Sequence, residues 1–213
     1  MGKRGLFITI EGGEGSGKSS LIQSLCSVLT SRKLSHVVTR EPGGTPFAEE
    51  VRKLLLDSHH TNGVSPTTEL LLFLAARLDH VEKIIEPALQ KGTAVLCDRY
   101  VDSTVAYQAY GREMDPDRIW NICTMHVPLL PDLTFYLDIS PEVGIERLNN
   151  RQQDIRDRLE SESSHFHERV RTGFLAMAQK WPKRIVVIDA TLPKEKLAGV
   201  VQHKLEEYLS LCT

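Results

Sequence analysis

Short apolar runs alternate along the chain with longer stretches in which apolar residues recur at helical spacing. The short runs have the length and the β-branched content of buried strands. They are Leu6–Ile10, His36–Thr39, Thr93–Cys97, Leu133–Asp138 and Ile185–Ile188. Strands separated by helical stretches are typical of a parallel sheet covered by helices on both faces. We therefore predict an α/β fold.

Two of the longer stretches predict amphipathic helices, each with one apolar face. The first face consists of Leu21, Ile22, Leu25, Val28 and Leu29, and the second of Leu70, Leu71, Leu74 and Leu78. Residues 149–158 are polar and lack periodicity, which predicts a loop rich in arginine.

Length and charge limit the classes of protein. A chain of 213 residues with 41% hydrophobic content buries one sizeable core, so we expect a single domain over residues 1–213. The net charge of −2 gives no general attraction to nucleic acid or to anionic membranes, and any phosphate chemistry must come from local clusters of arginine and lysine.

The cysteines and the chain start indicate a compartment. Cys26, Cys97, Cys123 and Cys212 have neither the spacing of a zinc site nor the density of a disulfide framework, which fits a reducing cytoplasm. The sequence also lacks the patterns of a signal peptide and of a membrane-spanning helix. We expect a soluble cytoplasmic protein.

A glycine-rich segment, EGGEGSGKSS, follows the first predicted strand at residues 11–20. Its spacing, Gly12-x-x-x-x-Gly17-Lys18-Ser19, fits a phosphate-binding loop between a strand and a helix, whose backbone N–H groups and helix dipole point at bound phosphates. Lys18 is expected to contact the β- and γ-phosphates, and the Ser19 hydroxyl to bind Mg²⁺. The alternative is an ordinary glycine turn.

The third predicted strand ends in Asp98-Arg99. Ligand groups of a doubly wound sheet lie at the carboxyl ends of its strands, so Asp98 is placed to hold Mg²⁺ or to orient the attacking oxygen. Arg99 suits a second phosphate, that of an acceptor. A GTPase would need an Asn-Lys-x-Asp clamp, which is absent, so a kinase is favoured. The alternative for Asp98 and Arg99 is a surface ion pair at a strand end.

Five blocks of the sequence together resemble the thymidylate kinase family. They are Glu11–Ser19, Thr39–Thr45, Leu72–Arg77, Asp98–Tyr100 with Ala106–Gln108, and Asp157–Glu160. The first block is shared by many phosphate-binding proteins, whereas the second, third and fourth together are far more selective.

The resemblance implies a P-loop nucleoside monophosphate kinase fold, with a five-stranded parallel sheet, helices on both faces and a short lid at about residues 147–160. It implies ATP-dependent phosphorylation of dTMP to dTDP with Mg²⁺, in a protein that is usually a homodimer. Another nucleoside monophosphate or deoxynucleoside kinase, and less strongly a non-enzymatic ATP switch, are the alternatives.

The resemblance also assigns an acceptor site. Phe73 would stack on thymine, Arg77 would donate to its carbonyl edge, and Arg52 and Arg99 would bind the acceptor phosphate. The other positions implied on this side are Glu14 for the 3′-hydroxyl, Glu41 and Pro42, often joined by a cis bond, and Ser103, Tyr107 and Gln108 around the nucleoside. By periodicity alone Phe73 is a core residue, Arg52 a solvated helix residue, and Tyr107 and Gln108 two sides of one helical turn.

The ATP site implied by the resemblance consists of the phosphate loop and two further positions. These residues are Gly12, Gly13, Glu14, Gly15, Ser16, Gly17, Lys18, Ser19, Ser20, Arg147 and Thr191. One branch of the family has arginine where this chain has Gly15, and the other carries its catalytic arginine in the lid. Among Arg151, Arg156 and Arg158, the resemblance favours Arg158 as that catalytic residue. A face of solvated or paired charges is the alternative for the other two.

Overall fold

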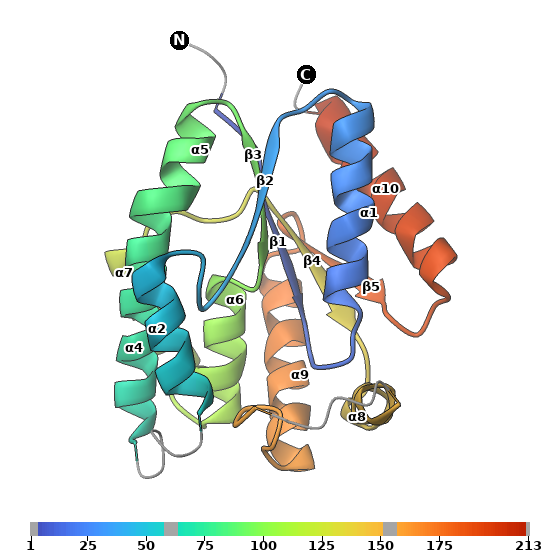
Figure 1. Ribbon diagram of the computed structural model, residues 1–213. Coiled ribbons are helices and arrows are strands. Elements are labelled where there is room, and N and C mark those ends of the chain that lie inside the picture. Colours follow the sequence, from blue (N-terminus) through green and yellow to red (C-terminus); the bar gives the residue numbers. More distant parts are fainter. Residues whose placement is uncertain (1–3, 58–63, 151–156, 212–213) are drawn as a thin grey trace.

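The structure is a computed structural model that describes residues 4–57, 64–150 and 157–211. Its five parallel strands form one sheet in the order β2-β3-β1-β4-β5 (Figure 1). Their bounds are β1 Phe7–Gly12, β2 His36–Arg40, β3 Ala94–Asp98, β4 Leu133–Asp138 and β5 Ile185–Asp189. Arg151, Arg156 and Cys212, which the sequence analysis named, lie outside the described residues.

Helical segments connect the strands and follow the last one. Before β3 they are α1 Lys18–Ser31, α2 Pro46–Leu56, α4 Pro66–His80, the π-helical η1 Val81–Ile85 and α5 Glu86–Gln90. After β3 they are α6 Val101–Thr104, the π-helical η2 Val105–Gly111, α7 Pro116–His126, α8 Pro141–Asn149, α9 Ser164–Lys180 and α10 Lys194–Leu211. Polar N-caps begin several of them, as at Thr45 and Ser163, whose hydroxyls accept from backbone N–H groups.

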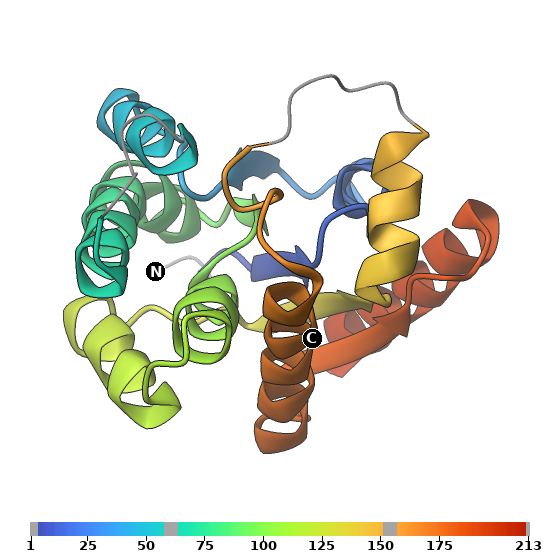
Figure 2. The same ribbon diagram turned by 90° about the horizontal axis from the view of Figure 1, so that it is seen from below.

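The sheet separates two apolar cores because successive side chains of a strand point to opposite faces. In β1, Phe7 packs into the core beneath α4, α7 and α9, whereas Ile8 and Ile10 pack beneath α1 and α10. The view from below shows these two helical layers on either side of the sheet (Figure 2). The predicted α/β fold with a parallel sheet and helices on both faces is therefore confirmed.

The predicted strands match the observed ones to within two residues at each end. The apolar face predicted for α1 is buried as expected. The face predicted for α4 is wrong in part. Leu70 and Leu74 are buried, but Leu71 and Leu78 are 57% and 40% exposed. Seven residues span nearly two full turns, so Leu71 and Leu78 form a second row beside the buried one.

The carboxyl ends of the strands meet at one edge of the sheet, the lower edge in Figure 1. The phosphate loop leaves β1 at this edge, and Glu41 and Arg99 follow β2 and β3 there. None of the helices in the described part of the chain is long and apolar enough to cross a membrane. Parallel topology thus brings together segments that are far apart in sequence.

Candidate active site

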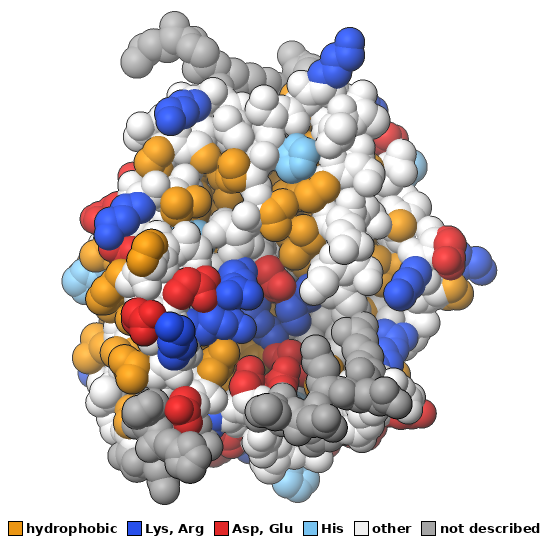
Figure 3. Space-filling view, in the orientation of Figure 1, with side chains coloured by type: hydrophobic (Ala, Val, Ile, Leu, Met, Phe, Trp, Pro, Cys, Tyr) orange, Lys and Arg blue, Asp and Glu red, His pale blue; other side chains and the backbone are white. Residues whose placement is uncertain are grey.

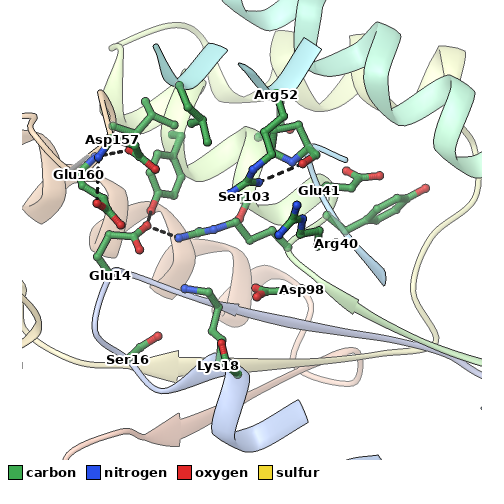
Figure 4. A pocket seen from close by; sticks show the side chains of 18 of the residues that line it. Glu14, Ser16, Lys18, Arg40, Glu41, Arg52, Asp98, Ser103, Asp157 and Glu160 are labelled. Carbon is green, nitrogen blue, oxygen red and sulfur yellow. Dashed lines mark hydrogen bonds and ion pairs between the residues drawn. The ribbon is translucent and has the colours of Figure 1, made fainter. Parts of the chain in front are cut away.

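A cavity of about 470 Å³ lies at the carboxyl edge of the sheet. Its walls come from the phosphate loop, the ends of β2 and β3, α2, α4, η2 and the residues Asp157, Leu159 and Glu160. Figure 3 shows Lys and Arg side chains gathered in this hollow with acidic groups beside them, and Figure 4 shows Lys18, Arg40 and Arg52 reaching toward one shared space. The five cationic side chains that line it are Lys18, Arg40, Arg52, Arg77 and Arg99.

The phosphate loop has the predicted form between a buried strand and a helix. Gly17, the N-cap of α1, adopts the left-handed conformation with φ 99°, which glycine allows at no steric cost. α1 begins at Lys18, so its unpaired N–H groups and the positive end of its dipole face the cavity. Ser16 is buried, and its hydroxyl has no hydrogen-bond partner among the residues that the structure describes.

Lys18 is held by two backbone oxygens. Its ammonium donates to the carbonyls of Gly12 and Gly13, both at 3.1 Å, and it has no ion-pair partner within the described residues. Burial and the neighbouring Arg99 guanidinium lower the pKa of Lys18, while the nearby carboxylates, Glu14 first among them, oppose that shift. The group therefore presents a positive charge that no carboxylate of the described chain neutralises by direct contact.

Arg99 links β3 to the phosphate loop. It has a positive φ of 68°, donates to Glu14 and to Ser103 (3.2 Å), and lies 5.1 Å from the centre of the Tyr107 ring. Burial alone would raise the pKa of Glu14, but Arg99 and Lys18 outweigh burial and lower it to about 2. The structure thus brings together the predicted residues Glu14, Arg99, Ser103 and Tyr107.

Arg77 is fixed by partners from three segments. Its Nε donates to Glu41 at 2.7 Å, its Nη2 donates to Thr104 at 2.8 Å, and the guanidinium lies 4.9 Å from the centre of the Tyr100 ring. Arg77 is 2% exposed, and its remaining nitrogen, Nη1, makes no hydrogen bond within the described residues, although the buried Cys123 thiol lies beside the guanidinium. One donor is therefore left over in a side chain that lines the cavity.

Glu41, which orients Arg77, is itself held from its other oxygen. Oε1 lies 3.1 Å from Nδ1 of His80, and Nε2 of His80 lies 2.6 Å from the Thr39 hydroxyl. The Glu41–Pro42 peptide bond is cis, as the resemblance suggested. Arg52 of α2 donates to the carbonyl of Pro42 at 3.0 Å.

Two of the residues with competing interpretations also line the cavity. Phe73 is half-buried and packs against the small core between α2 and α4, so it is both a core residue and a wall of the cavity. Gln108 is 1% exposed, and its amide donates to Glu69 at 2.9 Å. Phe73 and Gln108 therefore each contact another part of the protein and also line the cavity.

A second cavity of about 670 Å³ lies on the other side of the phosphate loop. It is lined by Gly15, Gly17, Ser20, Arg147 and Thr191 among others. Arg147 donates to the backbone carbonyl of Ala190 at 2.9 Å, so α8 and the loop after β5 are joined over this cavity. Gly15, Ser16, Gly17 and Ser20 line both cavities, so the phosphate loop forms their shared wall.

Arg158 does not line either cavity. Its guanidinium donates to Glu69 and to the carbonyl of Leu55 (3.0 Å), so the side chain lies along the ends of α2 and α4. Its neighbours Asp157, Leu159 and Glu160 do line the cavity of about 470 Å³. In this structure the predicted catalytic arginine is therefore not brought to the phosphate loop, because it is held by a buried carboxylate.

The thymidylate kinase family model matches residues 10–199. A curated thymidylate kinase of Protochlamydia amoebophila is 44% identical over 97% of this chain and 95% of its own length. One of Acholeplasma laidlawii is 45% identical over 94% of this chain and 98% of its own length. The chain belongs to the thymidylate kinase family.

A solved structure supports the family assignment. The crystal structure of thymidylate kinase from Ehrlichia chaffeensis is 36% identical in sequence and superposes with a TM-score of 0.71, covering 87% of this chain and 93% of that chain. The fold predicted from the family resemblance is therefore confirmed.

The residues of this cavity fit a metal ion that is held by few protein ligands. Asp98 carries a buried oxygen, Oδ1, without a partner in the described part of the chain, and the exposed Ser19 lines the same cavity. The described residues contain no group of three or more His, Cys, Asp or Glu side chains placed to hold a metal. This donor set suits Mg²⁺, which usually keeps several waters and is shared with substrate phosphates.

Sequence analysis missed several residues that the structure places at or beside the site. Arg40 ends β2 and pairs with Glu49 at 3.0 Å, Thr104 fixes Arg77, and Glu11 lies in β1 just before the loop. Position at the end of a parallel strand is the signal that would have found Arg40, as it found Asp98. Thr104 has no such signal, because only the tertiary packing brings it to α4.

Glu11 is fully buried near the end of β1, directly before the phosphate loop. It accepts hydrogen bonds from the Tyr100 N–H (2.8 Å) and the Ser103 hydroxyl (2.5 Å). Burial, together with the charge of Asp102, raises the pKa of Glu11 to about 8. At pH values between its ordinary pKa and about 8, Glu11 keeps its proton in the folded protein and loses it in the unfolded chain. This proton uptake stabilises the folded protein at low pH, and the stabilisation is lost as the pH rises toward 8.

We therefore expect the wild type to lose stability relative to the Glu11→Gln variant as the pH rises from about 5.5 to about 8.5. The difference between their free energies of unfolding should change by at least about 1.4 kcal/mol, which corresponds to one pKa unit. Denaturant titrations at both pH values measure the difference, and Glu50→Gln, at an exposed position, is the control. An equal difference between wild type and Glu11→Gln at both pH values would show that Glu11 has no raised pKa.

Proposed function

We propose that the protein transfers the γ-phosphoryl group of ATP to dTMP, giving ADP and dTDP. One observation supports the proposal most directly: two cavities share the phosphate loop as a wall. The cavity of about 470 Å³ is also lined by the aromatic ring of Phe73 and by Arg77, whose Nη1 is unpaired. Family membership supports the same reaction. The free cysteines Cys26, Cys97 and Cys123 support a reducing, cytoplasmic location.

In the proposed reaction, an oxygen of the dTMP phosphate attacks the γ-phosphorus, and the bond to the β,γ-bridging oxygen breaks. The electron pair of that bond leaves with ADP. Charge spreads over the transferred oxygens, so the protein's part is positioning and fixed positive charge. Lys18 would supply that charge at the β- and γ-phosphates. Its ammonium is held beside the phosphate loop by hydrogen bonds to the carbonyls of Gly12 and Gly13.

Mg²⁺ would be held by the Ser19 hydroxyl and the Asp98 carboxylate together with the ATP phosphates. When bound, the ion neutralises phosphate charge during transfer. Asp98 is suited to this role because its buried Oδ1 has no partner within the described residues, and an unpaired buried oxygen is costly unless a ligand completes it.

The acceptor side would read thymine through Arg77 and Phe73. Phe73 would stack on the ring, which every base allows, so it contributes affinity without selectivity. The unpaired Nη1 of Arg77 is a donor and requires an acceptor, such as a thymine carbonyl. An amino group, as in cytosine, would leave that buried donor unsatisfied, and this mismatch rejects the wrong base.

The remaining acceptor contacts follow from the cavity lining. Arg52 and Arg99 would bind the acceptor phosphate, Glu14 the 3′-hydroxyl, and Tyr107 would close the space beside the sugar. Glu41, Pro42, Ser103 and Gln108 complete this side as residues that hold the others or face the nucleoside. ATP would lie along the loop, with its adenine between Arg147 and Thr191.

We place the chain in the family branch that uses a lid arginine, with residues 147–160 as the lid. The support comes from Gly15. A Cβ atom at this position would lie 2.3 Å from the carbonyl oxygen of Gly144 in α8, and its φ of 69° also disfavours a side chain. An arginine in the phosphate loop therefore does not fit at residue 15, and the transferred charge must be met from elsewhere.

We further propose a homodimer that pairs the outer face of α2 and α4. Phe47 and Leu54 lie seven residues apart on α2, Leu71 and Leu78 lie seven apart on α4, and all are 40–57% exposed. The two helices pack side by side, so the four residues form one apolar face. Exposed apolar faces of this kind mark sites of association.

The first prediction concerns the acceptor. With ATP and Mg²⁺, ADP release should depend on dTMP, be weaker with dUMP, which lacks the methyl group but keeps the carbonyl, and be nearly absent with dCMP, AMP and GMP. The measurement is a coupled ADP assay across this panel. Equal turnover of AMP would support a different nucleoside monophosphate kinase, and ATP binding without ADP release for any acceptor would support the non-enzymatic switch.

The second prediction concerns assembly. The wild type should elute at twice the chain mass in size-exclusion chromatography with light scattering, and the Leu54→Glu/Leu71→Glu double variant should shift to the monomer. Met125→Glu, at a 75% exposed position on α7 outside the proposed face, should leave the dimer intact. A monomeric wild type, or a double variant that stays dimeric, would refute this interface.

A further inference from the structure

Glu69 is a buried carboxylate in α4 whose two oxygens are both occupied. Oε1 accepts from Gln108 (2.9 Å) and from Arg112 Nε (3.2 Å), and Oε2 accepts from Arg112 Nη2 (3.2 Å) and from Arg158. Burial would raise the pKa of Glu69, but the hydrogen bonds and charges of these partners lower it. We call Glu69, Gln108, Arg112 and Arg158 the Glu69 cluster.

Arg158 also binds the end of α2. Its Nε donates to the carbonyl of Leu55 at 3.0 Å, and its backbone N–H donates to the carbonyl of Leu56 at 3.2 Å. The last carbonyls of a helix have no partner within the helix, so these two contacts cap α2. Arg158 thus contacts α2, through these carbonyls, and α4, through Glu69.

The elements joined by the Glu69 cluster carry the acceptor-side residues. Arg52 lies one helical turn before Leu56 on α2, and Phe73 lies one turn after Glu69 on α4, followed by Arg77 one turn later. Gln108 of η2 is bound to Glu69 directly. The Glu69 cluster therefore connects α2, α4 and η2, the three elements that carry these cavity residues.

The cluster extends toward α9 through a second carboxylate. Glu162 lies 2.6 Å from Arg112 and 4.0 Å from Arg158, and Arg112 lies 4.8 Å from the centre of the Phe166 ring. Asp157, Leu159 and Glu160, which flank Arg158, line the cavity themselves. Holding Arg158 in place therefore also holds this turn over the acceptor side.

We propose that Arg158 and Glu69 are positioning residues for the acceptor nucleotide: their contact fixes α2, α4 and η2 relative to one another and so sets the spacing of Arg52, Phe73 and Gln108. This inference rests on the proposed function. It assigns Arg158 a structural contact with the acceptor walls in place of direct charge neutralisation at the transferred phosphoryl group, so within the proposed lid-arginine branch that charge would come from Arg151 or Arg156.

The two roles differ in steady-state kinetics. Loss of an arginine that acts on the transferred phosphoryl lowers kcat by about 10³-fold or more. Loss of a positioning contact shifts the acceptor walls, and a misplacement of about 1 Å is sufficient for an effect of about 100-fold. We expect Arg158→Ala and Glu69→Gln to raise the KM for dTMP by about 10- to 100-fold, with the KM for ATP nearly unchanged and with kcat lowered much less than 10³-fold.

Conservative and paired variants sharpen the test. Arg158→Lys keeps the charge but cannot donate to both Glu69 and Leu55 in the same fixed geometry, so it should restore the KM for dTMP only in part. The Glu69→Gln/Arg158→Ala double variant should be scarcely worse than the worse single variant, because both changes break one contact. Asp117→Asn on α7, which removes an exposed ion pair with Lys180 of α9, is the control.

A measurement without nucleotide separates this inference from the proposed function. Amide hydrogen exchange in the last turn of α2 should be faster in Arg158→Ala than in the wild type and Asp117→Asn, because the cap is lost. If Glu69→Gln fails to fold, the two Arg158 variants carry the test. A wild type inactive with dTMP would refute the proposed function but leave this exchange result to decide the contact.

Results of two kinds, kinetic and structural, would overturn the inference. The first is a loss of kcat by about 10³-fold in Arg158→Ala with an unchanged KM for dTMP, which would assign Arg158 to catalysis. The second is exchange in α2 that is unaffected by Arg158→Ala, or strictly additive effects of the two substitutions, which would show that the contact does not couple these elements.

Discussion

Mutual repulsion of the positive charges around one cavity is the constraint on which the rest of this site depends. Cations at close range must be held by oxygen atoms if they are to stay in place without a ligand. Arg40, Arg77 and Arg99 are held by the carboxylates of Glu49, Glu41 and Glu14, whereas Lys18 and Arg52 are held by backbone carbonyls. The two groups held by carbonyls keep their charge uncompensated by direct contact, which preorganises the cavity for phosphate.

The buried polar atoms without a partner also indicate that this cavity is preorganised for a ligand. Ser16 Oγ, Arg77 Nη1 and Asp98 Oδ1 are the buried side-chain atoms that lack a partner within the described residues, and all three residues line the same cavity. Buried polar groups are nearly always paired, so unpaired atoms gathered in one place mark where a ligand completes the structure. A phosphate, a carbonyl and a cation are the groups that would satisfy a hydroxyl, a guanidinium and a carboxylate, respectively.

Much of this arrangement was predictable from local patterns, and the rest required tertiary contacts. Strands and the phosphate loop follow from apolar runs and glycine spacing, which act over a few residues. Leu71 was misassigned because a helix so rich in leucine has two adjacent apolar rows, and periodicity does not say which row meets the core. The direction of Arg158 depends on Glu69, which lies 89 residues away in the sequence, so its motif predicted that the residue matters but not what it contacts.

The most direct test of the account is to separate transfer from acceptor binding in the Lys18→Met variant. Within the described residues Lys18 donates only to backbone carbonyls of the loop, so its removal takes away positive charge without breaking a contact that holds another side chain of the cavity. Turnover of dTMP should fall by on the order of 100-fold or more, while the Kd for dTMP, measured by calorimetry on the folded variant, should stay within about threefold of the wild type. Retained turnover, or lost dTMP binding in a variant that melts like the wild type, would contradict it.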